Sequence, residues 1–244
     1  MKVFVLGVGA TGSLLAKLLV RQGHQVMCGD CDPTRARAFL GEHSTLVIQR
    51  VHARNVRSIV KAAKGGVRLA AQDEVVTIPH VLRVREMDAK IGGIDMERLR
   101  RWYRQGKLTR SRGLVEARFP ATPTPRAMSK LVRRGILRNE RFAAAILVYG
   151  RKRTRPFMVR WDALFPSLYE LRHGGLTCSP VAWSAAQITA LFVKYMPKEL
   201  AGVYAPEALP IATRRNILKA ARSRGIRLTK TVTRLKPSDK THGS

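Results

Sequence analysis

Acidic residues are scarce in this chain. Its 244 residues include 16 Asp and Glu against 46 Lys and Arg, which gives a formal net charge of +30 and a pI near 11.5. An excess of this size predicts contact with a polyanion, such as nucleic acid, an anionic membrane surface or a phosphorylated ligand. The alternative is that arginine only solvates the surface of the protein.

Cysteines and long apolar runs are also few. Cys28, Cys31 and Cys178 are too few for a disulfide framework. Cys28 and Cys31 spell CxxC, but they straddle the predicted end of a strand, whereas redox pairs usually open a helix, so we assign them neither a redox nor a metal role. No apolar stretch reaches the roughly 20 residues of a membrane span, and the chain opens into a strand instead of a leader peptide. The sequence therefore predicts a cytoplasmic protein.

The first 30 residues carry the clearest pattern. An apolar run at 3–6 predicts a strand, and apolar residues at helical spacing over 13–21 predict a helix. A glycine-rich turn joins them, made of Gly7, Val8, Gly9, Ala10, Thr11 and Gly12. A second predicted strand, 25–29, ends at Asp30. Strand, GxGxxG turn and helix, followed by an acid at the end of the next strand, are typical of a dinucleotide-binding unit.

Each glycine of this turn has a physical reason. Gly7 permits a sharp turn, Gly9 lets backbone N–H groups approach a pyrophosphate, and Gly12 lets the helix pack close to the sheet. We therefore predict that Gly7 to Gly12 and Asp30 bind NAD or NADP. NAD is favoured, because a carboxylate accepts hydrogen bonds from the ribose 2′-hydroxyl and repels a 2′-phosphate. The alternative is an ordinary βαβ crossover that binds nothing.

A second helix is predicted to follow, with Asp32 as its N-cap and Pro33 at its first position. Arg35 and Arg37 within it would soften the preference for NAD. Further predicted elements are a strand over 46–51, a helix over 56–63 and a strand over 67–71. Such alternation predicts a Rossmann-type parallel sheet with right-handed crossovers. Beyond residue 71 the pattern weakens, so we expect the half that would hold the nicotinamide ring to be truncated or heavily altered.

Positive charge concentrates between residues 98 and 160, where 19 Lys or Arg stand against two Glu. Trp102 and Tyr103 lie among these arginines and either stack on bases or form the buried face of a helix. Residues 142–149 and 156–161 predict a β-hairpin with a basic tip, which is either solvated or in contact with a polyanion. Helices are predicted over 126–134, 180–195 and 212–224, and a last strand over 226–232.

Two separated blocks of this sequence resemble the saccharopine dehydrogenase family. The first is VLGVGATGSLLAKLLVRQGHQVMCGDCDPTRARAF, followed by VHARNVRSIVKAAKG. The second comprises LVYGRKRTRPFMVRWDAL, LTCSPVAWSAAQITALFV and GVYAPEALP, then Arg224, Gly225 and Ile226. Its order of hairpin, Ala-rich helix, Pro-Glu turn and helix ending in Arg-Gly-Ile is similar to the closing part of that family.

The resemblance implies an NAD(P)-dependent oxidoreductase that transfers hydride to or from an amino-acid or imine substrate. Gly7, Gly9, Gly12 and Asp30 would be its cofactor residues. The predicted organisation is a dinucleotide-binding unit (1–93), a basic connecting region (94–141), a mixed α+β substrate-type domain (142–236) and a disordered tail (237–244). An oligomer is compatible with it. The chain is shorter than typical members and lacks two of their motifs, a strand ending in Asn-Ala and a Thr-Gly-x-Pro step before the last long helix, so no catalytic residue carries across.

Candidates for a proton-transferring residue are the histidines His52, His80 and His173, each of which is equally well explained as a surface or capping residue. The rival hypothesis is a catalytically inactive Rossmann-derived protein that binds nucleic acid or another polyanion through its basic middle. No helix-turn-helix, zinc-finger or RNP motif supports it. A third interpretation is a divergent chain whose middle does not pack tightly.

Overall fold

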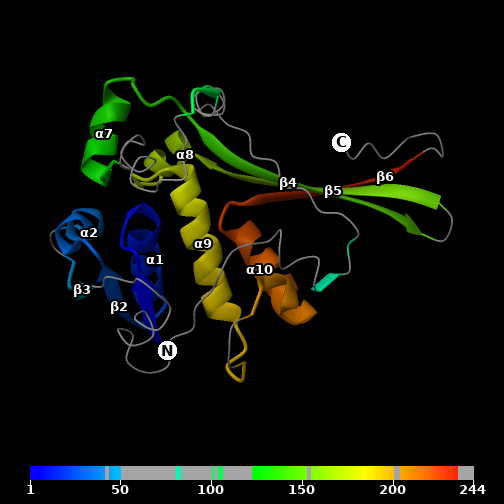
Figure 1. Cartoon of the computed structure of the whole chain (residues 1–244), viewed down its shortest axis with the longest axis horizontal. Helices are drawn as coiled ribbons and strands as arrows, with labels where there is room; N and C mark the ends of the chain where they lie inside the picture. The colour runs from blue at the N-terminus through cyan, green and yellow to red at the C-terminus, as the bar shows by residue number, and fades with distance from the viewer. Residues whose placement is uncertain are drawn as a thin grey trace. The chain divides into compact units, whose positions relative to one another are not determined.

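The structure is a computed structural model that describes residues 1–41, 44–50, 81–82, 84, 101, 104–106, 123–152, 155–200 and 204–235 (Figure 1). The chain divides into two compact units, of which the larger comprises residues 1–68, 124–202 and 210–244 and the smaller residues 69–123 and 203–209. The α-helices and strands discussed below all belong to the larger unit. No helix among the described residues is long and apolar enough to span a membrane.

Among its described residues, the larger unit contains two three-stranded sheets. Its elements are β1 (Lys2–Leu6), α1 (Ala10–Arg21), β2 (Gln25–Asp30), α2 (Pro33–Leu40), β3 (Ile48–Arg50), α7 (Pro125–Arg133), β4 (Arg141–Lys152), β5 (Arg155–Ser167), α8 (Leu168–His173), α9 (Pro180–Tyr195), α10 (Ile211–Ser223) and β6 (Arg227–Arg234). A 3₁₀ turn, Pro206–Ala208, lies in the smaller unit.

The first sheet is parallel, with strand order β1-β2-β3. Helices α1 and α2 make the two crossovers, so the predicted α/β class is confirmed. Strand β3 is shorter than the predicted 46–51, covering only Ile48–Arg50. The helix predicted over 56–63 and the strand over 67–71 lie outside the described residues, as do most of the basic middle and the tail.

The core of this sheet forms where α1 packs on it. Val5, Val8, Leu19 and Cys28 are buried there together with small residues of α1 and α2. Helix α9 lies beside α1 (Figure 1) and contributes Val193 to the same cluster. The high apolar content of α9 explains why half of its residues are buried, Trp183 among them.

Three helices begin with the same sequence signal, a short polar cap followed by proline. The side chains of Asp32, Thr124 and Ser179 each accept a hydrogen bond from a backbone N–H in the first turn of α2, α7 and α9, respectively. Proline follows each cap, where its missing N–H costs nothing. The predicted starts of these helices are therefore confirmed to within one residue.

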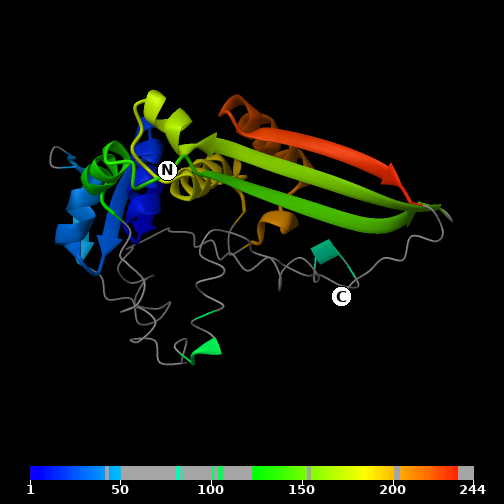
Figure 2. The same ribbon diagram turned by 90° about the horizontal axis from the view of Figure 1, so that it is seen from above.

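The second sheet is antiparallel, in the order β4-β5-β6. The predicted hairpin is confirmed, and both of its strands are longer than predicted. The distal ends of the three strands extend beyond α9 and α10 (Figure 2). The described structure thus has a parallel sheet and a separate antiparallel sheet, and both belong to the larger unit.

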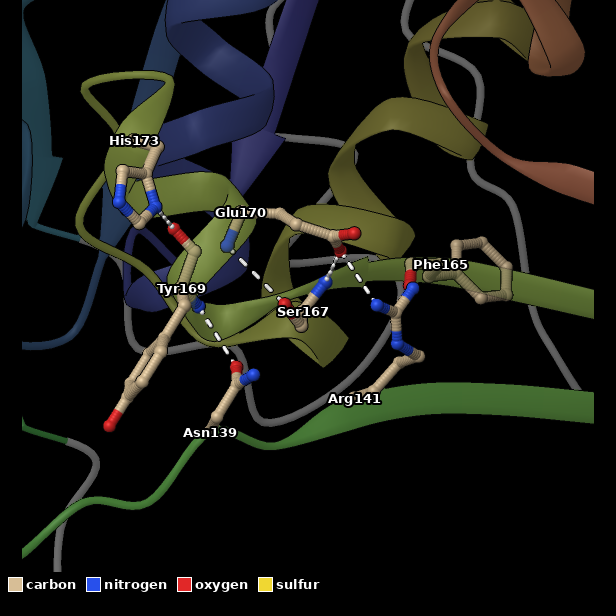
Figure 3. A network of polar contacts seen from close by, with 7 residues as sticks. All are labelled: Asn139, Arg141, Phe165, Ser167, Tyr169, Glu170 and His173. Carbon is tan, nitrogen blue, oxygen red and sulfur yellow. Dashed lines mark hydrogen bonds and ion pairs between the residues drawn. The ribbon is translucent and has the colours of Figure 1, made fainter.

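Helix α8 was not predicted from the sequence, and a capping box fixes its start (Figure 3). The Ser167 N–H donates to Glu170 Oε2 at 2.6 Å, and the Glu170 N–H donates to Ser167 Oγ at 3.3 Å. Arg141 on β4 contacts the same Glu170 oxygen at 2.9 Å and donates to the Phe165 carbonyl. This network ties the end of β5 and the start of α8 to β4.

Replacing Glu170 with Gln is expected to lower the stability of the protein in a pH-dependent way. The hydrogen bond from the Ser167 N–H, followed by that from Arg141, holds the pKa of the Glu170 carboxyl below its ordinary value. A lowered folded-state pKa contributes stability above about pH 5, which is lost as the pH falls through that pKa. The thermal midpoints of wild type and E170Q should therefore differ at pH 7 and converge in acid. A difference that stays constant down to about pH 3 would contradict this assignment.

Candidate functional site

The glycine turn leaves β1 at its carboxyl end. Gly7 has φ +82°, a conformation that side-chain-bearing residues rarely adopt, and its N–H donates to the Gly29 carbonyl at 2.8 Å. That hydrogen bond fixes the turn to the neighbouring strand β2. The turn therefore lies at the carboxyl edge of the sheet, where open α/β folds bind ligands.

Gly12 and Gly9 differ in why they lack a side chain. A Cβ on Gly12 would lie 1.9 Å from the Gly7 carbonyl oxygen, so close packing of α1 on the turn requires glycine there. A Cβ on Gly9 would meet nothing within 4 Å, and Gly9 has a negative φ that alanine tolerates. Packing within the protein therefore explains why residue 12 is glycine, but it does not explain why residue 9 is. The open space at Gly9 is what a ligand approaching the backbone would need.

The start of α1 carries no side-chain cap. Gly9 is its N-cap residue, and its first turn contains no acidic residue. The N–H groups of a helix start are unsatisfied within the helix and carry a partial positive charge. Small residues and free donors at this position suit a phosphate group.

Asp30 at the end of β2 turns its carboxylate toward the glycine turn. Oδ2 accepts the Val8 N–H at 2.6 Å, and Oδ1 accepts the Asp32 N–H at 2.9 Å. The side chain is half-buried, and each oxygen keeps a second lone pair for a further donor. The structure thus brings together the predicted turn residues and the predicted acid.

The arginines near Asp30 have different environments. Arg37 donates to the Ser44 carbonyl at 2.6 Å and to the Leu46 carbonyl at 3.2 Å, and so holds the segment that leads into β3. Arg35 is exposed, with its guanidinium carbon 5.9 Å from the centre of the Phe39 ring. Arg50 was not singled out from the sequence, although it aligns with Asp30 in the β2–β3 register. Only strand register could have revealed it.

Replacing Arg37 with Gln is expected to lower the free energy of unfolding by about 1–3 kcal/mol, because two backbone carbonyls lose a charged donor. The ratio of NADH to NADPH affinity should not change, since the side chain of Arg37 is occupied. Arg35→Gln is the matched control, and its stability should stay within about 0.5 kcal/mol of wild type. Urea denaturation measures both. Equal stability of R37Q and R35Q would show that the Arg37 contacts are unimportant.

The two cysteines of the CxxC sequence lie in unlike surroundings. Cys28 is buried in β2, where desolvation raises the pKa of its thiol to about 11, and Cys31 is exposed beyond the strand end. Cys28 therefore stays protonated and unreactive at neutral pH. No cluster of three or more metal-ligating side chains occurs in the described ranges.

The candidate histidines are only partly described. His52 and His80 lie outside the described residues, and so do Trp102 and Tyr103. His173 is exposed at the end of α8, with Nδ1 2.7 Å from the Tyr169 carbonyl oxygen of the same helix (Figure 3). This contact is typical of a residue at a helix end.

The fold and the turn define an α/β protein whose parallel sheet carries a glycine-rich turn and an acid at its carboxyl edge. Comparisons of the chain with protein-family models, curated proteins and solved structures gave no match. The resemblance to saccharopine dehydrogenases therefore rests on the quoted sequence blocks alone.

Proposed function

We propose that this protein binds NAD or NADP through the turn from Gly7 to Gly12 and through Asp30. The observation that carries the proposal is the direction of the Asp30 carboxylate, which accepts the Val8 N–H at 2.6 Å. An acid in this place can hold the ribose of an adenosine while the pyrophosphate lies on the backbone of the turn. The open space at Gly9 and the uncapped start of α1 support the same position for the pyrophosphate.

The charge of Asp30 decides which of the two cofactors, NAD or NADP, binds more tightly in this proposal. Asp30 would accept hydrogen bonds from ribose hydroxyls and repel a 2′-phosphate, so NAD is the preferred form in this proposal. Arg37 is held by carbonyls, which leaves Arg50, aligned with Asp30 in the strand register, as the cation beside the acid. Its charge would narrow the difference in affinity between the two cofactors without reversing it.

The proposed class is an oxidoreductase, and this part rests on the resemblance to saccharopine dehydrogenases. A bound nicotinamide supplies the hydride or accepts it, and the protein contributes orientation and a proton donor or acceptor. The substrate class implied by the resemblance is an amino acid or an imine. No side chain among the described residues is assigned to the proton transfer.

Titration of the purified protein with NADH and NADPH, followed by nicotinamide fluorescence, tests the proposal. We expect saturable binding of both, with NADH bound more tightly. A signal that does not saturate with either nucleotide would remove the cofactor assignment and, with it, the oxidoreductase assignment.

A further inference from the structure

One face of the antiparallel sheet combines apolar, aromatic and basic side chains. Residues directly opposite each other in an antiparallel pair project to the same face, and alternate residues of one strand share a face. On β5 this face holds Phe157, Val159 and Trp161. Their partners are Gly150, Val148 and Ile146 on β4, and Arg234, Val232 and Lys230 on β6. We call these nine residues the sheet platform.

The sheet platform is open over much of its area. Ile146 is 62% exposed, Val148 46% and Val232 59%, whereas the three β5 residues are half-buried. A Cβ on Gly150 would lie 3.2 Å from Cζ of Phe157, so the Phe157 ring lies across that glycine. The absence of a side chain at Gly150 thus lets the Phe157 ring pack directly on the β4 backbone.

Each aromatic ring of the sheet platform has a cation opposite it in the register. Lys230 faces Trp161, with Nζ 5.7 Å from the centre of a Trp161 ring, and Arg234 faces Phe157. The two rings are four residues apart on one strand, which corresponds to about 13 Å. One apolar row, Val159 and Val232, separates the two pairs.

No carboxylate neutralises these cations within the sheet. The described strands β4, β5 and β6 contain a single acid, Asp162, whose place in the strand puts it on the opposite face. There Arg160 holds it through hydrogen bonds of 2.8 to 3.0 Å. The side chains of the sheet platform are therefore apolar or positively charged, and none is acidic.

We propose that the sheet platform binds single-stranded nucleic acid. Bases would stack on Phe157 and Trp161 while Lys230 and Arg234 contact the phosphates, a combination that binds single strands with little sequence preference. Charge complementarity favours this ligand over a second copy of the chain, because two such faces would oppose cations without a carboxylate between them. The inference is independent of the nucleotide site.

Fluorescence anisotropy of a labelled oligo(dT) of about 20 nucleotides with the full-length protein tests this inference over a salt series. Lys230→Gln with Arg234→Gln should weaken binding about tenfold and reduce the log–log salt slope by about 1.4, since two phosphate contacts are lost. The matched control is Arg126→Gln with Arg133→Gln, which removes the same charge from exposed positions of α7. It should change affinity less than about twofold.

The stacking role is tested separately. Trp161→Leu should weaken binding roughly 5- to 100-fold, while Trp161→Phe should keep most of the affinity. Circular dichroism shows whether each variant folds. If W161L does not fold, the double variant of Lys230 and Arg234 together with W161F decides whether the sheet platform binds the oligonucleotide.

Several results would overturn the inference. The first is absence of oligonucleotide binding at low salt. The second is an equal loss of affinity in the platform variant (Lys230 and Arg234) and the α7 control (Arg126 and Arg133). The third is wild-type affinity in W161L. If the double variant of Lys230 and Arg234 loses binding to phosphatidylserine vesicles but not to the oligonucleotide, the sheet platform binds membranes instead. If the same variant changes the sedimentation coefficient of the protein without losing oligonucleotide binding, the sheet platform mediates self-association instead.

Discussion

Gly12→Ala is expected to destabilise the protein strongly, whereas Gly9→Ala should cost at most about 1 kcal/mol of stability and weaken nucleotide binding tenfold or more. The Cβ at Gly12 would meet the Gly7 carbonyl oxygen at 1.9 Å and Cγ1 of Val5 at 3.4 Å. Backbone atoms cannot yield as a flexible side chain would, so α1 must shift off the turn. We expect a loss of about 3 kcal/mol in the free energy of unfolding, at the upper end for overpacking.

Gly9→Ala separates ligand contact from packing. Its Cβ would meet no protein atom within 4 Å, so urea denaturation should show only the loss of up to about 1 kcal/mol that is expected when alanine replaces glycine as a helix N-cap. The same methyl group would stand where the pyrophosphate approaches the backbone, so affinity for NADH should fall tenfold or more, about 1.4 kcal/mol at least. Wild-type affinity in G9A would show that no ligand comes close to this part of the turn.

Asp30→Ala is expected to weaken NADH binding by about 10- to 150-fold, the range for hydrogen bonds to a charged group. NADPH binding should fall less, because the same substitution removes the repulsion of its 2′-phosphate. The preference for NADH over NADPH should therefore shrink or reverse. Fluorescence titration with both nucleotides measures this change.

Substitution of Asp30 should also lower the stability of the protein. The buried Val8 N–H loses its acceptor in D30A, which costs about 1–3 kcal/mol. Asp30→Asn keeps a side-chain oxygen as an acceptor for this N–H, so it should retain more stability while still losing the charge. An unchanged NADH to NADPH ratio in both variants would mean that Asp30 only holds the turn.

The first sheet could be predicted because its signals are local. The strand, the turn and the helix over residues 3–21 follow from hydrophobic spacing and glycine, and the Asp32–Pro33 pair marks the next helix start. Local chemistry decides these features, so one sequence is enough.

Other features depend on contacts between distant residues. Helix α8 is six residues long, and its start is held partly by Arg141 from another strand, a contact that no local pattern shows. The structural role of Arg37 depends on carbonyls at Ser44 and Leu46, which face it only after folding. The sheet platform depends on strand register, which sets Lys230 opposite Trp161.

The most direct measurement of the central claim is a calorimetric titration of the full-length protein with ADP-ribose. This ligand contains the adenosine, the pyrophosphate and the second ribose but no nicotinamide, so it needs only the turn and the acid. We predict saturable binding with one site per chain, weakened in G9A and D30A and unchanged in R35Q. Absence of binding to wild type, or equal binding to wild type and G9A, would contradict the account.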